Sequence, residues 1–145
     1  MNPLKALHDY GQSPWLDYIR RSLITSGELQ RHIKEDGLCG MTSNPAIFEK
    51  AITGSTDYTE SLEELRKKHT DAQEIYEALA IADIRDAADV LLPVYEKTRR
   101  RDGYVSLEVS PFLANEIEGT IKEARRLWAA VERPNLMVKV PATPE

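Results

Sequence analysis

Four short apolar runs, separated by long stretches with helical periodicity, constrain the fold of this chain more than any other sequence feature. The runs cover residues 15–19, 38–42, 104–110 and 135–142. The segments between them are far too long for hairpin turns, so neighbouring strands must be joined by crossovers and must run parallel. The sequence therefore predicts an α/β fold in which helices cover a parallel sheet of about four strands.

Helix start and stop signals divide the segments between these runs. The expected helices cover residues 4–10, 26–36, 44–52 and 115–131, with two more inside residues 59–101. Thr25 with Glu28 and Thr70 with Gln73 have the spacing of capping boxes, and Asn115 with Glu118 is a further capping signal. Gly37 should end the second helix, and Pro93 should bend the helix that contains it.

The last predicted strand is not followed by a helix that could cover it. An uncovered parallel sheet has open edges and an exposed apolar face. A barrel of eight strand-helix units needs about 250 residues, so a chain of 145 supplies about half of one. We expect one partial domain over residues 1–145, the N-terminal half of an incomplete (β/α)8 TIM-type barrel, and we expect copies of it to associate.

Composition and charge exclude several classes of protein. The chain has a formal net charge of -5 and no basic stripe, which argues against nucleic-acid binding. No apolar stretch is long enough to span a membrane, and the first residues lack the apolar core of a signal peptide. The single cysteine, Cys39, cannot form an internal disulfide. The expected location is the cytoplasm.

Three of the apolar runs each contain one ionisable residue near the middle: Asp17, Glu108 and Lys139. Side chains alternate across a strand, so Glu108 should share a face with Ser106 while the apolar residues around it face the helices. In the last run, Met137 and Lys139 should point to the barrel interior, and Leu136, Val138 and Val140 should face the helices. We therefore expect Lys139 and Glu108 to meet inside the barrel.

A lysine in a water-poor interior loses the hydration of its ammonium group, and burial can lower the pKa of such a lysine. Its neutral amine can attack a ketone, and the protonated imine then accepts electrons from the adjacent carbon–carbon bond. Glu108 suits the proton transfers of imine formation, and Asp17 suits the removal of a proton from a sugar hydroxyl. Taken singly, Lys139 fits a solvated lysine better than a nucleophile, and Glu108 or Asp17 fits a salt bridge or a helix cap better than a catalytic group. The presence of three such residues at similar strand positions brings the two interpretations close to even.

Other residues suggest no cofactor chemistry. The three histidines, His8, His32 and His69, lack metal-ligand spacing, so no metal site is expected. No glycine-rich dinucleotide motif is present, and Cys39 is expected to be a small core side chain.

Three segments closely resemble the signatures of the transaldolase family. They are GMTSNPAIF at residues 40–48, YVSLEVSP at 104–111 and NLMVKVPAT at 135–143. The segments EGT at 118–120 and EARRLW at 123–128 are similar to the intervening helix of that family. The resemblance covers essentially the whole chain, and the long form of the family, which includes fusions to glucose-6-phosphate isomerase, is the most similar group.

The resemblance implies a barrel of the aldolase class that moves a dihydroxyacetone unit between sugar phosphates in the pentose phosphate pathway, without a cofactor. Lys139 matches the Schiff-base lysine, Glu108 the carboxylate that acts through a water, and Asp17 the acid/base group. Asn44 matches the asparagine that holds the donor's hydroxyls, and Thr42 and Ser43 beside it are expected to support the site. Pro45 should keep the backbone of Asn44 out of the helical region.

No part of the chain matches the family's phosphate-binding arginine and serine, so the fragment by itself is expected to be inactive or impaired. An aldolase that releases the three-carbon unit is the enzymatic alternative. A non-catalytic half-barrel that acts only by association is the alternative from another class.

Overall fold

The computed structural model describes residues 2–144, so Met1 and Glu145, the predicted ends of the domain, lie outside the described residues. Its strands are β1 (Trp15–Asp17), β2 (Gly40–Thr42), β3 (Tyr104–Glu108) and β4 (Leu136–Lys139). Its longer helices are α4 (Pro45–Thr53), α5 (Thr59–Leu65), α6 (Ala72–Lys97) and α7 (Ile117–Val131). The shorter ones are α1 (Pro3–Ala6), η1 (Leu7–Tyr10), α2 (Arg21–Thr25), α3 (Glu28–Arg31), η2 (His32–Asp36) and η3 (Pro111–Leu113).

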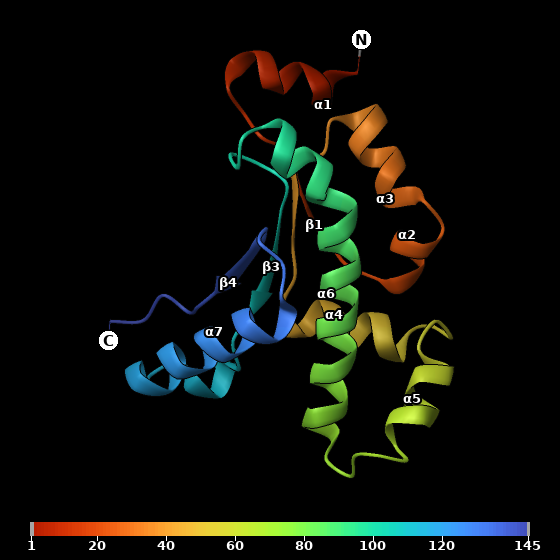
Figure 1. The fold of residues 1–145 in the computed structure, drawn as a ribbon, viewed down its shortest axis with the longest axis vertical. Helices are drawn as coiled ribbons and strands as arrows, with labels where there is room; N and C mark the ends of the chain where they lie inside the picture. Colours follow the sequence, from red (N-terminus) through yellow and green to blue (C-terminus); the bar gives the residue numbers. More distant parts are fainter. Residues whose placement is uncertain (1, 145) are drawn as a thin grey trace.

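The four strands form one parallel sheet in the order β1-β2-β3-β4 (Figure 1). This confirms the predicted parallel sheet, and the sequential strand order is that of one arc of a (β/α)8 barrel. The register pairs Asp17 with Thr42 and Glu108 with Lys139. Because the strands are parallel, the residues that end them lie along one edge of the sheet.

The strands are shorter than predicted. β1 ends at Asp17, and Ile19, which was expected to belong to it, is fully buried in the connection to α2. β4 ends at Lys139, before Pro141, which has no backbone N–H for the ladder. Val140 was expected to face the helices, but it lies beyond the strand and is 47% exposed.

The helix expected over residues 26–36 begins two residues later than predicted, because α3 starts at Glu28 and continues directly into the π-helical turn η2, which ends at Asp36. Gly27, with a left-handed φ of 83°, lies before it and separates it from α2, a short helix that was not predicted. Thr25 does not cap a helix; its hydroxyl donates to the carbonyl oxygen of Arg21. The predicted stop at Gly37, with a φ of 72°, is confirmed.

Two of the other predicted helix starts lie one residue away from the observed ones. α6 is capped by Asp71, whose side chain accepts from the amide of Gln73, rather than by Thr70. α7 follows Glu116 and has no side-chain cap, so the role assigned to Asn115 is wrong. The division of residues 59–101 into two helices is confirmed by α5 and α6, and Pro93 lies inside α6.

The main core lies between the sheet and the helices that cover it. Its fully buried side chains include Leu29, Met41, Ile84, Leu91 and Val105, from α3, β2, α6 and β3. In Figure 1, the long helix α6 runs beside the sheet and antiparallel to its strands, from the edge where the strands end. Within residues 2–144, no helix is both long and apolar enough to cross a bilayer.

Candidate active site

Lys139 and Glu108 are the last residues of two neighbouring strands and are direct partners in the register. Their side chains form an ion pair, with 2.9 Å between Nζ and Oε2. The Lys139 side chain is 40% exposed and that of Glu108 is 20% exposed. The predicted meeting of the two residues is thus seen, but the described strands do not enclose the lysine as expected, because the sheet is open on the side of β4.

Ser43 connects this pair to the middle of the sheet. Its backbone carbonyl oxygen accepts a hydrogen bond from Lys139 Nζ at 3.1 Å. Its hydroxyl, buried with the rest of the residue, donates to the carbonyl oxygen of Ser106 at 2.7 Å, and its amide nitrogen donates to Ser106 Oγ at 3.4 Å. Ser43 therefore fixes the end of β2 against β3 and presents a carbonyl dipole to the lysine.

Asp17 and Thr42 form a second polar pair, at the ends of β1 and β2. The hydroxyl of Thr42 donates to Asp17 Oδ1 at 2.6 Å, which holds the carboxylate at the edge where the strands end. Asp17 is separated from Lys139 by two intervening strands. With neighbouring strands about 4.8 Å apart, the two backbones are roughly 14 Å apart along the sheet.

Asn44 begins helix α4 directly after β2. Its backbone is extended, with φ -152° and ψ 167°, as predicted from Pro45. Its Oδ1 accepts from the amide of Ile47 at 2.9 Å, which makes it the N-cap of the helix. Among residues 2–144 its Nδ2 group has no hydrogen-bond partner, so two donors remain free for a ligand hydroxyl.

A cavity of about 270 Å³ adjoins Glu108 on the helical side of the sheet. Its lining includes Pro45, Tyr76, Ser110 and the exposed ring of Phe112. Burial, together with the charge of Glu108, raises the pKa of Tyr76 to about 12, so this phenol stays protonated at neutral pH. Glu108 thus lines this cavity and also pairs with Lys139.

Several residues of this region were not singled out by the sequence. Ser106 was assigned only to the polar face of its strand, and the Ser43 backbone carbonyl was not foreseen as a partner of Lys139. The alternation of β3 puts Ser106 and Glu108 on one face, so that pattern could have identified Ser106. Nothing in the sequence marks a backbone carbonyl as a ligand, because every residue has one.

Within the part of the chain that the structure describes, no three His, Cys, Asp or Glu side chains are grouped so as to hold a metal ion. Each histidine has a different hydrogen-bond partner: His8 contacts the carbonyl oxygen of Gly37, His32 contacts Asp36, and His69 contacts Glu74. Cys39 is buried, as expected, and burial raises the pKa of its thiol to about 11.

Comparison with known proteins gives matches over nearly the whole chain. The family model described as Transaldolase/Fructose-6-phosphate aldolase matches residues 14–145. A transaldolase of Thiobacillus denitrificans is 53% identical over 145 residues, all of this chain and 40% of the relative. Transaldolases of Trichodesmium erythraeum and Neisseria gonorrhoeae are each 49% identical over 99% of this chain, and over 38% and 40% of their own lengths. The chain thus spans about two fifths of the curated relatives it matches.

Proposed function

This chain belongs to the transaldolase/fructose-6-phosphate aldolase family, and we propose that its four strands supply the imine-forming part of a transaldolase site. The observation that carries the proposal is the ion pair between Lys139 and Glu108 at the ends of two adjacent parallel strands. In barrels of this kind the reacting groups lie at that edge of the sheet. The proposed substrates are ketose and aldose phosphates such as fructose 6-phosphate and glyceraldehyde 3-phosphate.

Lys139 is the proposed nucleophile. After it loses a proton to Glu108, its amine attacks the ketone carbon, and loss of water from the adduct leaves an imine. Glu108, which touches Nζ, is placed to supply the proton that the departing hydroxyl needs, directly or through a water. The Ser43 carbonyl oxygen, the second partner of Nζ, limits the directions in which the amine can turn.

Asp17 is the proposed base for the next step. It takes the proton from the hydroxyl beside the carbon–carbon bond that breaks, and the bond's electron pair moves to the protonated imine. The aldehyde fragment leaves, and an acceptor aldehyde takes its place as the same steps run in reverse. Thr42 holds one carboxylate oxygen of Asp17, which leaves Oδ2 for the hydroxyl.

Asn44 is the proposed binding residue for the hydroxyls of the three-carbon unit. Its Oδ1 is occupied as the cap of α4, which orients the side chain, and its NH₂ group has no hydrogen-bond partner within residues 2–144. The same proposal places the reaction in the non-oxidative pentose phosphate pathway and the protein in the cytoplasm, and it assigns residues 1–145 to one partial barrel domain.

The test is imine trapping. The protein is incubated with fructose 6-phosphate and borohydride, which reduces an imine to a stable amine, and the adduct is mapped by mass spectrometry. We expect an adduct on Lys139 that is absent in Lys139→Ala and retained in Lys122→Ala, which removes an exposed lysine of α7. If the chain extended through all eight strands also fails to form an adduct, the proposal is wrong.

Adduct formation only in the extended chain would support the alternative that these 145 residues by themselves are non-catalytic. The family description also includes fructose-6-phosphate aldolase. Product analysis with and without an acceptor aldehyde separates transfer of the three-carbon unit from its release.

A further inference from the structure

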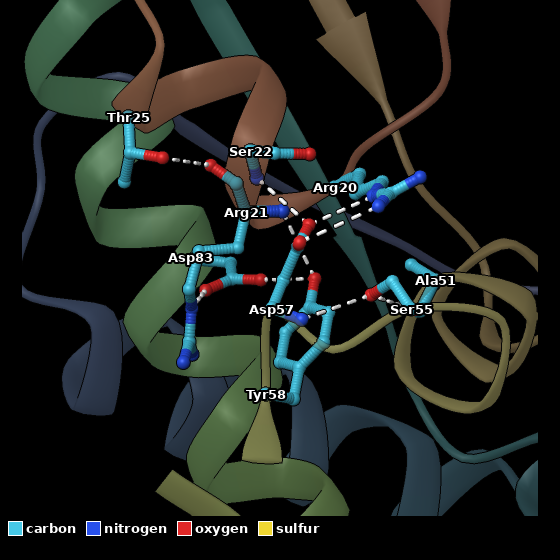
Figure 2. Close-up of polar contacts among 9 residues, drawn as sticks. All are labelled: Arg20, Arg21, Ser22, Thr25, Ala51, Ser55, Asp57, Tyr58 and Asp83. Carbon is cyan, nitrogen blue, oxygen red and sulfur yellow. Dashed lines mark hydrogen bonds and ion pairs between the residues drawn. The ribbon is translucent and has the colours of Figure 1, made fainter. Parts of the chain in front are cut away.

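Five residues from three distant segments form a polar network beside the end of β1 (Figure 2). Arg21 begins helix α2 and Arg20 is its N-cap residue, Asp57 and Tyr58 precede α5, and Asp83 lies in α6. The Tyr58 and Asp83 side chains are fully buried. None of these residues belongs to the proposed imine-forming pair, so imine formation does not account for the network.

The centre of the network is the Asp83 carboxylate. Its Oδ1 accepts from Arg21 Nε at 2.9 Å, and its Oδ2 accepts from the Tyr58 hydroxyl at 2.7 Å. The same Tyr58 oxygen accepts from the backbone amide of Arg21 at 3.0 Å, and the Arg21 guanidinium lies 4.5 Å from the centre of the Tyr58 ring. Ser61 Oγ accepts from Arg21 Nη1 at 2.7 Å. Arg21 is thus held through both its backbone and its side chain.

Asp57 holds the preceding turn. Its Oδ2 accepts from Arg20 Nε at 2.7 Å and from the backbone amide of Ser22 at 3.2 Å. Figure 2 shows both donors directed at this carboxylate, with Ser55 connecting Asp57 to the end of α4 through Ala51. Helix α2 has no cap from its own side chains, and Asp57 takes that role from a distant segment.

The network lies next to the short connection that follows Asp17 in the chain. Asp17 ends β1 and Arg21 begins α2, with the fully buried Ile19 between them. Hydrogen bonds to β2 hold one end of this short connection, and the network holds the other. The position of the Asp17 carboxylate therefore depends on contacts made by residues that do not touch it.

Burial raises the pKa of Asp83, and its contacts with Tyr58 and Arg21 act in the opposite direction. Well-packed apolar side chains would often give a buried site equal or greater stability than such a charged pair. Stability alone therefore does not explain why a charged network lies here. A role in fixing the position of nearby residues explains it better.

We propose that Tyr58, Asp83 and Arg21 are positioning residues that hold Asp17 for the proton transfer of carbon–carbon cleavage. This inference rests on the proposed function, because it needs Asp17 as the base. It predicts that disturbing the network slows carbon–carbon cleavage but not imine formation. Imine formation takes place at Lys139, on the opposite edge of the sheet, and does not depend on the network.

The test uses Tyr58→Phe, which removes one hydroxyl and with it the contacts to Asp83 and to the Arg21 amide. In the chain extended through all eight strands, we expect the cleavage rate to fall by about tenfold or more, since small misplacements of a reacting group have large effects on rate. The amount of trapped imine at Lys139 should stay within about twofold of the unmodified protein. Asp83→Asn should show the same selective loss.

Two control variants separate positioning from general destabilisation. Tyr104→Phe makes the same chemical change at the other end of the sheet, where the hydroxyl donates to the carbonyl oxygen of Arg100. Ile84→Val removes a buried methylene group next to Asp83 without touching the network. Both should leave the ratio of cleavage to trapped imine unchanged. An equal fall of that ratio in Ile84→Val and Tyr58→Phe would overturn the inference.

A double variant asks whether Tyr58 acts through Asp17. In an Asp17→Asn background, Tyr58→Phe should cause no further loss of cleavage, and a full additional loss would contradict the proposed route. Absence of imine in the unmodified extended chain would overturn the proposed function, and this inference with it. Normal imine with unaltered cleavage in Tyr58→Phe would overturn the inference alone.

Discussion

At the scale of single residues, Lys139 has two partners of different kinds, the Glu108 carboxylate and the Ser43 backbone carbonyl oxygen. A side chain that is 40% exposed would be free to turn in solvent without them. Only the Glu108 carboxylate can exchange a proton with the Lys139 amine. Replacing Glu108 therefore tests the proton transfer while the Ser43 carbonyl contact remains in place.

Glu108→Gln keeps the size of the side chain and removes its charge and its ability to carry the proton. We expect borohydride-trapped adduct to accumulate about 100-fold more slowly, the lower end of what general acid–base groups contribute. Glu63→Gln, at an exposed position of α5, is the matched control and should react at the normal rate. An unchanged rate in Glu108→Gln would remove this residue from the proposed mechanism.

Asn135 is a second residue with a role that one substitution can test. It is fully buried, and its Nδ2 donates to the carbonyl oxygens of Ala88 and Gly103, which join β4 to α6 and to the start of β3. Asn135→Ala leaves both acceptors without this donor, so unfolding should cost about 2–3 kcal/mol less. Urea denaturation measures the loss, and the exposed Asn115→Ala should show almost none.

At the scale of secondary-structure elements, Asn44 combines a structural and a proposed binding role. Its Oδ1 caps α4, while its NH₂ group is the part proposed to bind substrate hydroxyls. Asn44→Asp keeps the capping oxygen and loses the donors, so stability should be retained while ketose binding weakens. Asn44→Ala should lose binding and also about 1 kcal/mol of stability. Equal ketose affinity in both variants and the unmodified chain would contradict the proposed role.

The contact between α2 and the segment before α5 should respond to acid. The Arg20 guanidinium and the contacts with Ser22 hold the pKa of Asp57 well below its usual range. Because this pKa is lower in the folded than in the unfolded state, the pair stabilises the fold at neutral pH. The contribution begins to decrease near pH 4, at about the usual pKa of an aspartate, and is lost as the pH falls toward the lowered pKa of the folded state.

Asp57→Asn should therefore be less stable than the unmodified chain at pH 7, and the difference should shrink toward pH 3. Thermal unfolding of both proteins from pH 7 to pH 3 measures this difference in stability. Because all other titrating groups are shared by the two proteins, their effects cancel in the difference. A difference that stays constant with pH would show that the ion pair does not contribute.

Asp83 of α6, which pairs with Arg21 of α2, has a pKa shift of the opposite sign. Burial raises the pKa of Asp83, so ionised Asp83 opposes folding more strongly as the pH rises through that pKa. The two carboxylates, Asp57 and Asp83, therefore respond differently to pH although they pair with the neighbouring arginines Arg20 and Arg21.

At the scale of the whole molecule, β1 and β4 are the edges of the described sheet, and apolar side chains next to β4 are exposed. Ile117, Ile121 and Trp128 lie on one side of α7 with 54%, 42% and 55% of their surfaces exposed, and Met137 of β4 is 43% exposed. Open edges and exposed apolar side chains favour association of chains.

We expect the 145-residue chain to associate in a concentration-dependent manner, as light scattering coupled to size-exclusion chromatography would detect. Replacing Ile121 by Lys and Trp128 by Glu should shift the mass toward the monomer. The matched control is Tyr10→Lys, because Tyr10 is 79% exposed but lies in η1. A stable, compact monomer of the unmodified chain would contradict this account of the edges.

The sequence alone determined the parallel sheet, the family, and the pairing of Lys139 with Glu108. Strand periodicity assigns residues to faces, and long crossovers force parallel order, so both features follow from local pattern. The boundaries of the short helices did not follow, since Gly27 delays the start of the helix predicted from residue 26, and the Thr25 hydroxyl bonds the carbonyl oxygen of Arg21 instead of capping that helix. Sequence signals for helix ends are weak, because the contacts that a segment makes in the folded protein can override them.

Only the tertiary structure decided how the site is held. The contacts between Lys139 and the Ser43 carbonyl, and between Tyr58 and the Arg21 amide, use backbone atoms that every residue carries. Asp57 and Asp83 lie 37 and 62 residues from the arginines they bind, and no local pattern relates such positions. The sequence therefore indicates which side chains are available for chemistry, while the packing of distant segments sets the geometry in which they would act.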